Sequence, residues 1–196
     1  MPKCYSDQER TQIKNRLLEE AERCLAQNGM KRTTVDELVR RVKIPKGTFY
    51  LFYSSKELLF FDVILRKHDL IEQQLYHAIQ KIDSSKDVGS QLTDIIVSFY
   101  KMAGEEPVLR MLHSDEIELL VKKLPQGMLE KHLQQDHSMV QQILGHYCSQ
   151  SIGDMNAITA AFRAIYFSTL HKTEIGEEDY EKALYLLVSG LISKLV

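Results

Sequence analysis

Residues 31–57, KRTTVDELVRRVKIPKGTFYLFYSSKE, decide the fold expected for this chain. The stretch predicts two short helices joined by a tight turn, with basic residues around both. Pro45 marks the turn, because proline lacks an N–H and disfavours helical backbone at the residue before it. Two short helices about such a turn, in basic surroundings, are typical of a helix-turn-helix that enters the major groove of DNA.

The first helix of the pair has a well-marked beginning. Thr34 can act as its N-cap, and Glu37, three residues later, completes a capping box. Apolar residues then recur at spacings of three and four, and the predicted buried stripe is Val35, Leu38, Val39 and Val42. This stripe needs a second element to cover it.

The second helix is expected over residues 46–52, with Phe49 and Tyr53 packed against the first helix. The residues that face outward would then include a glycine that lets another surface approach the backbone closely. They also include donors for phosphates or base edges and one leucine suited to a thymine methyl group. The predicted DNA contacts, with the helix start and one flanking lysine added, are Thr34, Lys46, Gly47, Thr48, Tyr50, Leu51 and Lys56.

Several short segments in and around this motif occur together in one known family. They are Gly29, Thr33-Thr34-Val35, Lys46-Gly47-Thr48-Phe49-Tyr50, Phe52-Tyr53 and Lys56-Glu57-Leu58. Over about residues 10–68, a third of the chain, the protein therefore resembles the tetracycline-repressor (TetR) family of bacterial transcription regulators. The resemblance implies a homodimer with an N-terminal DNA-binding domain and a cavity for a ligand in the rest of the chain.

Two positions depart from the pattern of that family. Lys43-Ile44-Pro45 stands in the turn where the family usually has Gly-Val-Ser, and Phe52 stands where a polar residue or histidine is common. These differences bear on which operator sequence is read rather than on the fold.

Size and charge agree with a globular protein that has one basic end. The chain has 196 residues, 44% of them hydrophobic, and a net charge of −2. Residues 1–67 hold 14 Lys or Arg against 9 Asp or Glu, whereas residues 68–196 hold 11 against 18. Only the first third therefore suits nucleic acid.

The cysteines and the apolar runs favour a soluble cytoplasmic protein with no membrane association. Cys4, Cys24 and Cys148 are an odd, widely spaced set, which suggests neither a disulfide framework nor a zinc site. The longest apolar runs fall far short of the ~18 residues that span a bilayer.

The periodicity of the whole chain predicts an all-α fold of about nine helices. Beyond the helix-turn-helix motif, at about 34–53, helices are expected at about 10–27, 56–82, 90–103, 107–123, 127–149, 154–172 and 177–195. We assign residues 10–68 to a DNA-binding domain and residues 69–196 to a ligand-binding and dimerisation domain.

The last two predicted helices carry more apolar surface than one bundle needs. Small residues among them would let helices approach closely, so they can dock across a twofold axis as a four-helix interface. The predicted interface residues are Ala160, Ala161, Leu184, Leu187 and Leu191. The same pattern also fits the core of a monomer, and it is the family resemblance that favours the dimer.

Aromatic residues, methionines and histidines in the second domain are the candidates for a ligand pocket. The predicted lining is Phe99, Tyr100, Met102, Met111, His113, His137, Phe162 and Tyr166. Ordinary core packing accounts for most of them equally well.

No catalytic or cofactor motif is present, so we expect neither an enzyme nor a bound cofactor. His132 and Asp136, with His137 beside them, and His146 near Cys148 match no known metal-ligand spacing, and no metal is predicted.

Together these features predict a ligand-responsive transcriptional regulator. We expect a repressor that binds a palindromic operator in double-stranded DNA as a homodimer and is released by a small apolar or amphipathic molecule. The alternative is a DNA-independent small-molecule carrier or adaptor with the same architecture, and an enzyme would need a catalytic site assembled from distant residues.

Overall fold

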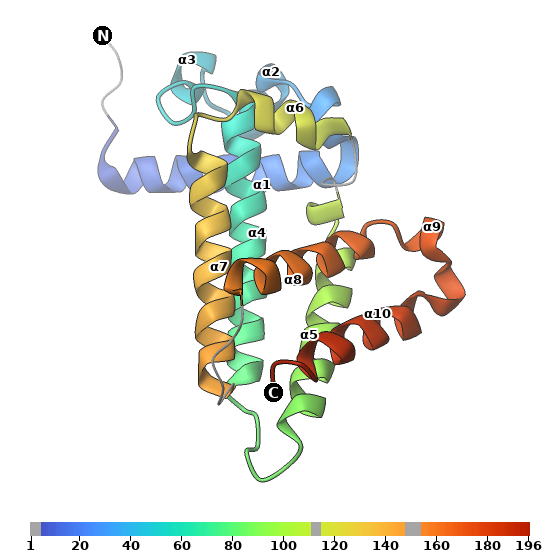
Figure 1. Ribbon diagram of the computed structural model, residues 1–196. Helices are drawn as coiled ribbons and strands as arrows, with labels where there is room; N and C mark the ends of the chain where they lie inside the picture. Colours follow the sequence, from blue (N-terminus) through green and yellow to red (C-terminus); the bar gives the residue numbers. More distant parts are fainter. Residues whose placement is uncertain (1–4, 111–114, 148–153) are drawn as a thin grey trace. The chain divides into compact units, whose positions relative to one another are not determined.

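A computed structural model describes residues 5–110, 115–147 and 154–196 (Figure 1). These residues form ten helices and no strand, so the predicted all-α class is confirmed. The helices are α1 (Asp7–Arg32), α2 (Val35–Val42), α3 (Lys46–Phe49), α4 (Lys56–Ile79), α5 (Val88–Glu105), α6 (Asp115–Lys123), α7 (Met128–Tyr147), α8 (Met155–Thr169), α9 (Lys172–Ile175) and α10 (Glu177–Ile192). The helix beyond the expected nine is α9, a single turn.

The described chain divides into two compact units. Unit 1 comprises residues 1–67 and 107–124, and unit 2 comprises residues 68–106 and 125–196. The segment that contains α6, which the sequence placed in the second domain, therefore belongs with the DNA-binding motif. None of the helices in the described residues is long and apolar enough to cross a membrane.

The first helix of unit 1 is longer at both ends than its apolar pattern predicts. At its start, the Ser6 hydroxyl accepts the N–H of Glu9, and the Glu9 carboxylate accepts the N–H of Ser6, which completes a capping box. Near its end the helix is broken at Gly29, where φ is 73° and ψ is 176°. The chain continues through one more turn to Arg32.

The break at Gly29 is closed by α6. The carboxylate of Glu116 accepts the backbone N–H groups of Met30 and Lys31, each at 2.8 Å. A Cβ atom at Gly29 would lie 3.0 Å from Glu116 Oε2. Glycine is therefore required twice here, for its positive φ and for the close approach of the carboxylate.

The core of unit 1 joins the helices around the motif. Its fully buried side chains include Leu17, Ala21, Leu38, Val42, Phe49, Leu59 and Phe60. The apolar stripe of α2 is therefore covered by other helices, as the sequence required. This packing holds α2 and α3 in a fixed orientation.

Unit 2 has a separate core. It is formed by one face each of α5, α7, α8 and α10 together with the end of α4, and its fully buried members are Leu92, Leu144, Leu184, Val188 and Ile192. Two tyrosines donate to backbone carbonyl groups of this unit: the hydroxyl of Tyr100, within the core, donates to Phe162 O, and the hydroxyl of the half-buried Tyr147 donates to Ile79 O, both at 2.8 Å.

Candidate nucleic-acid interface

Helix α2 begins at the predicted cap. The Thr34 hydroxyl accepts the N–H of Glu37 at 3.2 Å. The other half of the predicted capping box is not formed, because the Glu37 carboxylate accepts a hydrogen bond from the Arg41 guanidinium at 2.6 Å instead. Thr34 is exposed at the positive end of the helix, where an anion is favoured.

Lys43-Ile44-Pro45 forms the turn between α2 and α3, as the sequence predicted, and Lys43 is its left-handed residue. Lys43 adopts a left-handed conformation, with φ 57° and ψ 49°, and donates its N–H to Arg40 O. This backbone geometry suits glycine and is strained for lysine, which gives a physical reason for the glycine that TetR-like sequences usually carry here. Pro45 then serves as the N-cap of α3.

Helix α3 is a single turn, shorter than the expected 46–52, and is followed by a turn through Tyr50 to Phe52. Its packing is as predicted, because Phe49 is fully buried and Tyr53 nearly so. On the opposite side, Tyr50 is 51% and Leu51 is 53% exposed. The turn therefore presents a large polar ring and an apolar side chain to solvent.

Gly47 leaves an open backbone on this exposed side. A Cβ atom placed there would meet no heavy atom within 4 Å, so no neighbour in the described chain excludes a larger residue. The structure accordingly leaves this position open to a partner, which the sequence prediction requires.

Thr48 is a correction to the predicted DNA contacts. It is only 6% exposed, and its hydroxyl lies 3.1 Å from the Tyr5 hydroxyl, within hydrogen-bond distance. Its side chain therefore faces the protein, where it contacts Tyr5, a residue that precedes α1. Helical periodicity depends on neighbouring residues and cannot reveal a contact with Tyr5, which lies 43 positions earlier in the chain.

Lys56 also has a different role from the one predicted. Its ammonium group donates to the backbone carbonyls of Met30 and Thr33, at 2.8 and 2.7 Å. These bonds satisfy carbonyls at the end of α1, a contact that the sequence did not predict. Lys56 is therefore an anchor of the fold in this structure.

Lys46 is exposed but has a partner in the free protein. Its Nζ lies 2.9 Å from Asp36 Oδ1, and the hydrogen bond to Asp36 raises the pKa of the lysine. Both side chains are more than half exposed, at 51% and 72%. Because such a pair is weakly held, a phosphate can replace the carboxylate, although Asp36 opposes any anion at this place.

Two features near α3 were missed in the sequence. The Tyr5 contact had no sequence signal, since it depends on where the N-terminal segment lies. The Arg10 guanidinium lies over the Phe52 ring, 5.3 Å from its centroid, which is a cation–π arrangement. Phe52, which departs from the family pattern, therefore positions a positive charge beside the motif.

Unit 2 contains a small apolar cavity. It has a volume of about 60 Å³ and is lined by Leu75, Ile79, Leu92, Ile96, Phe99, Tyr100, Met139, Val140, Ile143, Leu144 and Phe162. Three of the predicted pocket residues, Phe99, Tyr100 and Phe162, are among them.

The other predicted pocket residues lie elsewhere. Met102 is 37% exposed, and Tyr166 packs beside Tyr100 without lining the cavity. His137 lies within hydrogen-bond distance of Thr159, 3.2 Å, at a shallow surface depression between α7 and α8. Met111 and His113 lie outside the described residues.

The predicted interface residues are split between the surface and the core. Leu184 is completely buried in unit 2 and Leu191 is half-buried against the same core, so Leu184 is corrected to a core residue. Leu187 is 51% exposed, and Ala160 is exposed on α8. Further large apolar side chains exposed on α8 and α10 are Phe167, Tyr185 and Leu186, the last at 70%.

Comparison with known proteins relates this geometry to a family. Residues 17–63 match the family described as bacterial regulatory proteins, tetR family. The Bacillus subtilis (strain 168) protein YuxN, described as an uncharacterized HTH-type transcriptional regulator, is 29% identical over 124 residues. The matched region is 60% of this chain and only 42% of YuxN, less than half the length of that relative.

Solved structures share the fold over nearly the whole chain. A TetR-family transcriptional regulator from Pectobacterium atrosepticum superposes with a TM-score of 0.70 at 14% identity, over 98% of this chain and 96% of that one. The structure of SmeT in complex with triclosan gives a TM-score of 0.61 at 15% identity, over 93% and 91% of the two chains. Residues 17–63 of this chain therefore match the tetR family of bacterial regulatory proteins, and the chain shares its fold with solved TetR-family regulators over nearly its whole length.

Proposed function

We propose that this protein is a transcriptional regulator that reads DNA with α3 and the turn after it. The observation that carries the proposal is the exposed surface formed by Lys46, Gly47, Tyr50 and Leu51 over a fully buried Phe49. A rigid turn with one buried side and one open, partly basic side is what major-groove reading requires. Thr34, at the exposed start of α2, adds a backbone phosphate contact.

The proposed DNA-binding species is a homodimer. Leu186, Leu187 and Phe167 expose apolar surface on α8 and α10, and a twofold axis would bring the same surfaces of two copies together. Two DNA-reading motifs would then meet a palindromic operator at half-sites separated by about one helical turn or a multiple of it. The proposed output is repression, because a dimer seated on a promoter would exclude RNA polymerase from the same grooves.

The dimer can be tested by replacing one exposed leucine with a charged residue. We expect Leu187→Glu to convert the dimer to a monomer in size-exclusion chromatography with light scattering at micromolar concentration. Lys182→Glu, on the same helix and 79% exposed at its side chain, is the matched control and should stay dimeric. A monomeric wild-type protein would refute this part of the proposal.

The proposed effector is a small apolar or amphipathic molecule that binds in the cavity of unit 2. The existing space of about 60 Å³ has room for only a few water molecules, so an effector must displace side chains to enter. Phe99 and Met139, which line the cavity and are only half-buried, are the side chains placed to move. Triclosan, the ligand bound to SmeT, is a suitable first probe of this chemical class.

A smaller cavity should weaken effector binding, and a larger cavity should strengthen it. We expect Ile96→Phe to fill the space and weaken triclosan binding, while Phe162→Ala should enlarge it and strengthen binding. Titration calorimetry on both folded variants measures the change. Equal affinity in the two variants would place the effector elsewhere.

The DNA-binding proposal is tested by fluorescence anisotropy with fragments from upstream of the gene and unrelated fragments of equal length. We expect preferential binding to one upstream fragment, with an affinity that falls steeply between about 50 and 200 mM salt. Bound effector should weaken that binding, since ligand and DNA favour different conformations. No binding to any fragment in about 50 mM salt would favour the alternative, a DNA-independent carrier or adaptor.

A further inference from the structure

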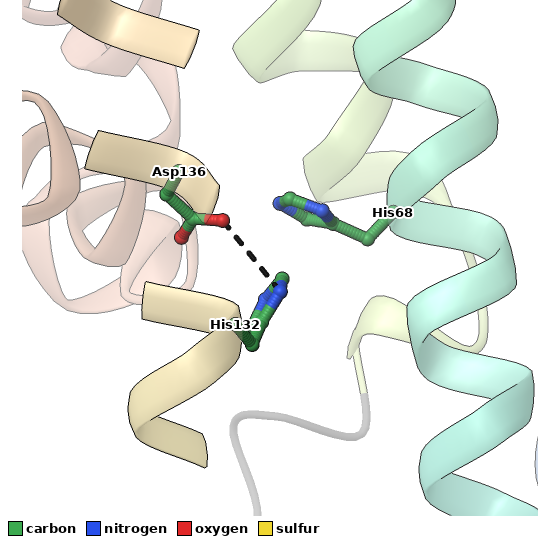
Figure 2. Close-up of side chains that lie close together, drawn as sticks. All are labelled: His68, His132 and Asp136. Carbon is green, nitrogen blue, oxygen red and sulfur yellow. Dashed lines mark ion pairs between the residues drawn. The ribbon is translucent and has the colours of Figure 1, made fainter. Parts of the chain in front are cut away.

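Four ionisable side chains meet within unit 2, outside the DNA-reading surface and outside the apolar cavity. Two belong to α4, His68 and Glu72, and two belong to α7, His132 and Asp136. Figure 2 shows the imidazole of His68 directed toward His132 and Asp136 on the facing helix. Each helix thus contributes one histidine and one carboxylate four residues later, on the same face.

The side chains are close enough to share one ion. Ligand atoms of His68, His132 and Asp136 all lie within 4.8 Å of one another, and the two imidazole rings meet edge to face with centroids 4.7 Å apart. Glu72 Oε1 lies 3.6 Å from His68 Nδ1, and Glu72 forms with His68 and Asp69 a second group whose ligand atoms lie within 4.8 Å of one another. Small side-chain rotations would bring nitrogen and oxygen atoms to the distance of about 2.0–2.2 Å that zinc requires.

Two polar atoms of this cluster lack hydrogen-bond partners in the described protein. His68 Nδ1 and Asp136 Oδ1 are buried and have no hydrogen-bond partner among the described residues. The ion pairs within the described chain give Asp136 and Glu72 only histidine partners, with no lysine or arginine. All four side chains are only about a fifth exposed, so water can satisfy their unpaired polar atoms only in part.

The electrostatics favour a cation at this position. Burial is the main cause that lowers the pKa of His68, while the charge of Asp136 acts in the opposite direction. Burial, with the charges of Asp136 and Asp69 added, raises the pKa of Glu72 to about 7. Asp136 and Glu72 each lie beside a histidine in this partly buried place, and a divalent ion there would offset their negative charge.

We propose that His68, His132 and Asp136, with Glu72 beside them, bind a divalent first-row transition metal. Two imidazoles and two carboxylates are ligands that such ions accept, whereas magnesium and calcium prefer oxygen alone. No metal was predicted from the sequence, because His132 and Asp136 alone match no known ligand spacing. The spacing of His68 and Glu72 repeats that of His132 and Asp136, and this repetition is the signal that was missed.

The proposal is tested on the full-length protein after removal of any affinity tag and treatment with a chelator. Zinc is titrated against a competing fluorescent chelator, and cobalt is added as a spectroscopic probe. We expect one equivalent of each metal to bind, with cobalt giving the visible absorption of a site with nitrogen and oxygen ligands. The thermal midpoint of the wild-type protein should rise when zinc is added.

Variants separate this site from surface histidines. We expect His132→Gln and Asp136→Asn to weaken zinc binding about 100-fold and to abolish the thermal shift, with helical circular dichroism unchanged. The matched controls are His77→Gln on α4 and His146→Gln on α7, which remove exposed histidines from the same helices. Wild-type affinity in both site variants, or no stoichiometric binding to the wild type, would overturn the proposal.

This proposal is independent of the DNA-binding proposal, because its measurements use no DNA. If the protein binds zinc but none of the DNA fragments, the metal site is supported and the DNA-binding proposal is not. Operator binding by a protein that takes up no metal would remove the metal site alone.

Discussion

The carboxylate of Glu116 on α6 accepts the backbone N–H of Met30 at 2.8 Å, at the point where Gly29 breaks α1. The same carboxylate accepts the N–H of Lys31, so one side chain satisfies two donors freed by the break. Lys56 binds the carbonyl of Met30 from the other side. The corner between α1 and α2, which carries the DNA-reading motif, is therefore held by two charged side chains from later in the sequence.

Removal of this carboxylate should destabilise unit 1. We expect Glu116→Ala to lower the free energy of unfolding by about 2–3 kcal/mol, because it leaves buried N–H groups unsatisfied. Chemical denaturation monitored by circular dichroism measures the loss. Glu118→Ala, which removes a carboxylate 76% exposed on the same helix, should change the stability by less than about 0.5 kcal/mol. Similar losses in both variants would contradict the role assigned to Glu116.

The left-handed conformation of Lys43 predicts a stabilising substitution. We expect Lys43→Gly to raise the free energy of unfolding by about 1 kcal/mol, because glycine adopts a φ of 57° without steric cost. Lys31→Gly, at an exposed helical position of the same unit, is the comparison and should lower it by a similar amount. A destabilised Lys43→Gly variant would show that the turn does not have this geometry.

The ion pair between Lys46 and Asp36 should limit DNA affinity. We expect Asp36→Asn to tighten operator binding several-fold in about 50 mM salt and less in about 200 mM salt, because it removes an exposed negative charge that competes for Lys46. Lys46→Ala should weaken binding to all sequences and reduce the salt slope by about one. Asp179→Asn, which breaks the exposed pair with Lys182 in unit 2, should leave binding unchanged.

Leu51 and Thr48 should differ in what their substitution changes. We expect Leu51→Ala to alter the preference among operator variants at a thymine by roughly tenfold, as a lost apolar base contact would. Thr48→Val should instead lower the free energy of unfolding by about 1 kcal/mol, because the contact with Tyr5 is lost, and should leave sequence preference unchanged. A changed base preference in the Thr48→Val variant would show that Thr48 contacts DNA.

The buried thiol of Cys24 should make stability fall at alkaline pH. Burial raises the pKa of Cys24 above its ordinary value of 9.0, although Arg41 acts in the opposite direction. The folded state therefore holds the thiol proton more tightly than the unfolded state, and this stabilisation is complete below pH 9 and is lost as the pH rises through the folded-state pKa. We expect the unfolding free energy of the wild type to fall more steeply between pH 8 and 10.5 than that of Cys24→Ala. Equal slopes would show that the thiol is not desolvated.

Local patterns in the sequence were sufficient for the helical fold and for the position of the motif. The cap at Thr34, the apolar stripe of α2 and the burial of Phe49 and Tyr53 follow from neighbours within one or two helical turns. The first helix was expected to end at about residue 27, and α1 is interrupted two residues later, at Gly29. These features need no knowledge of distant contacts, which is why they could be read from residue order alone.

Features that depend on distant partners could not be predicted in this way. Thr48 contacts Tyr5, Lys56 donates to backbone carbonyls near the end of α1, and Glu116 on α6 accepts the N–H of Met30. Each of these contacts joins residues that are far apart in the sequence. The facing pairs of α4 and α7 are likewise ordinary helical spacings until packing brings the two helices together. The sequence by itself determined the all-α class, the helix-turn-helix and the basic end of the chain, because these depend on periodicity and charge. The tertiary structure alone decided which polar groups face solvent, which satisfy the backbone and which meet as a cluster, because each of these depends on contacts between residues far apart in the chain.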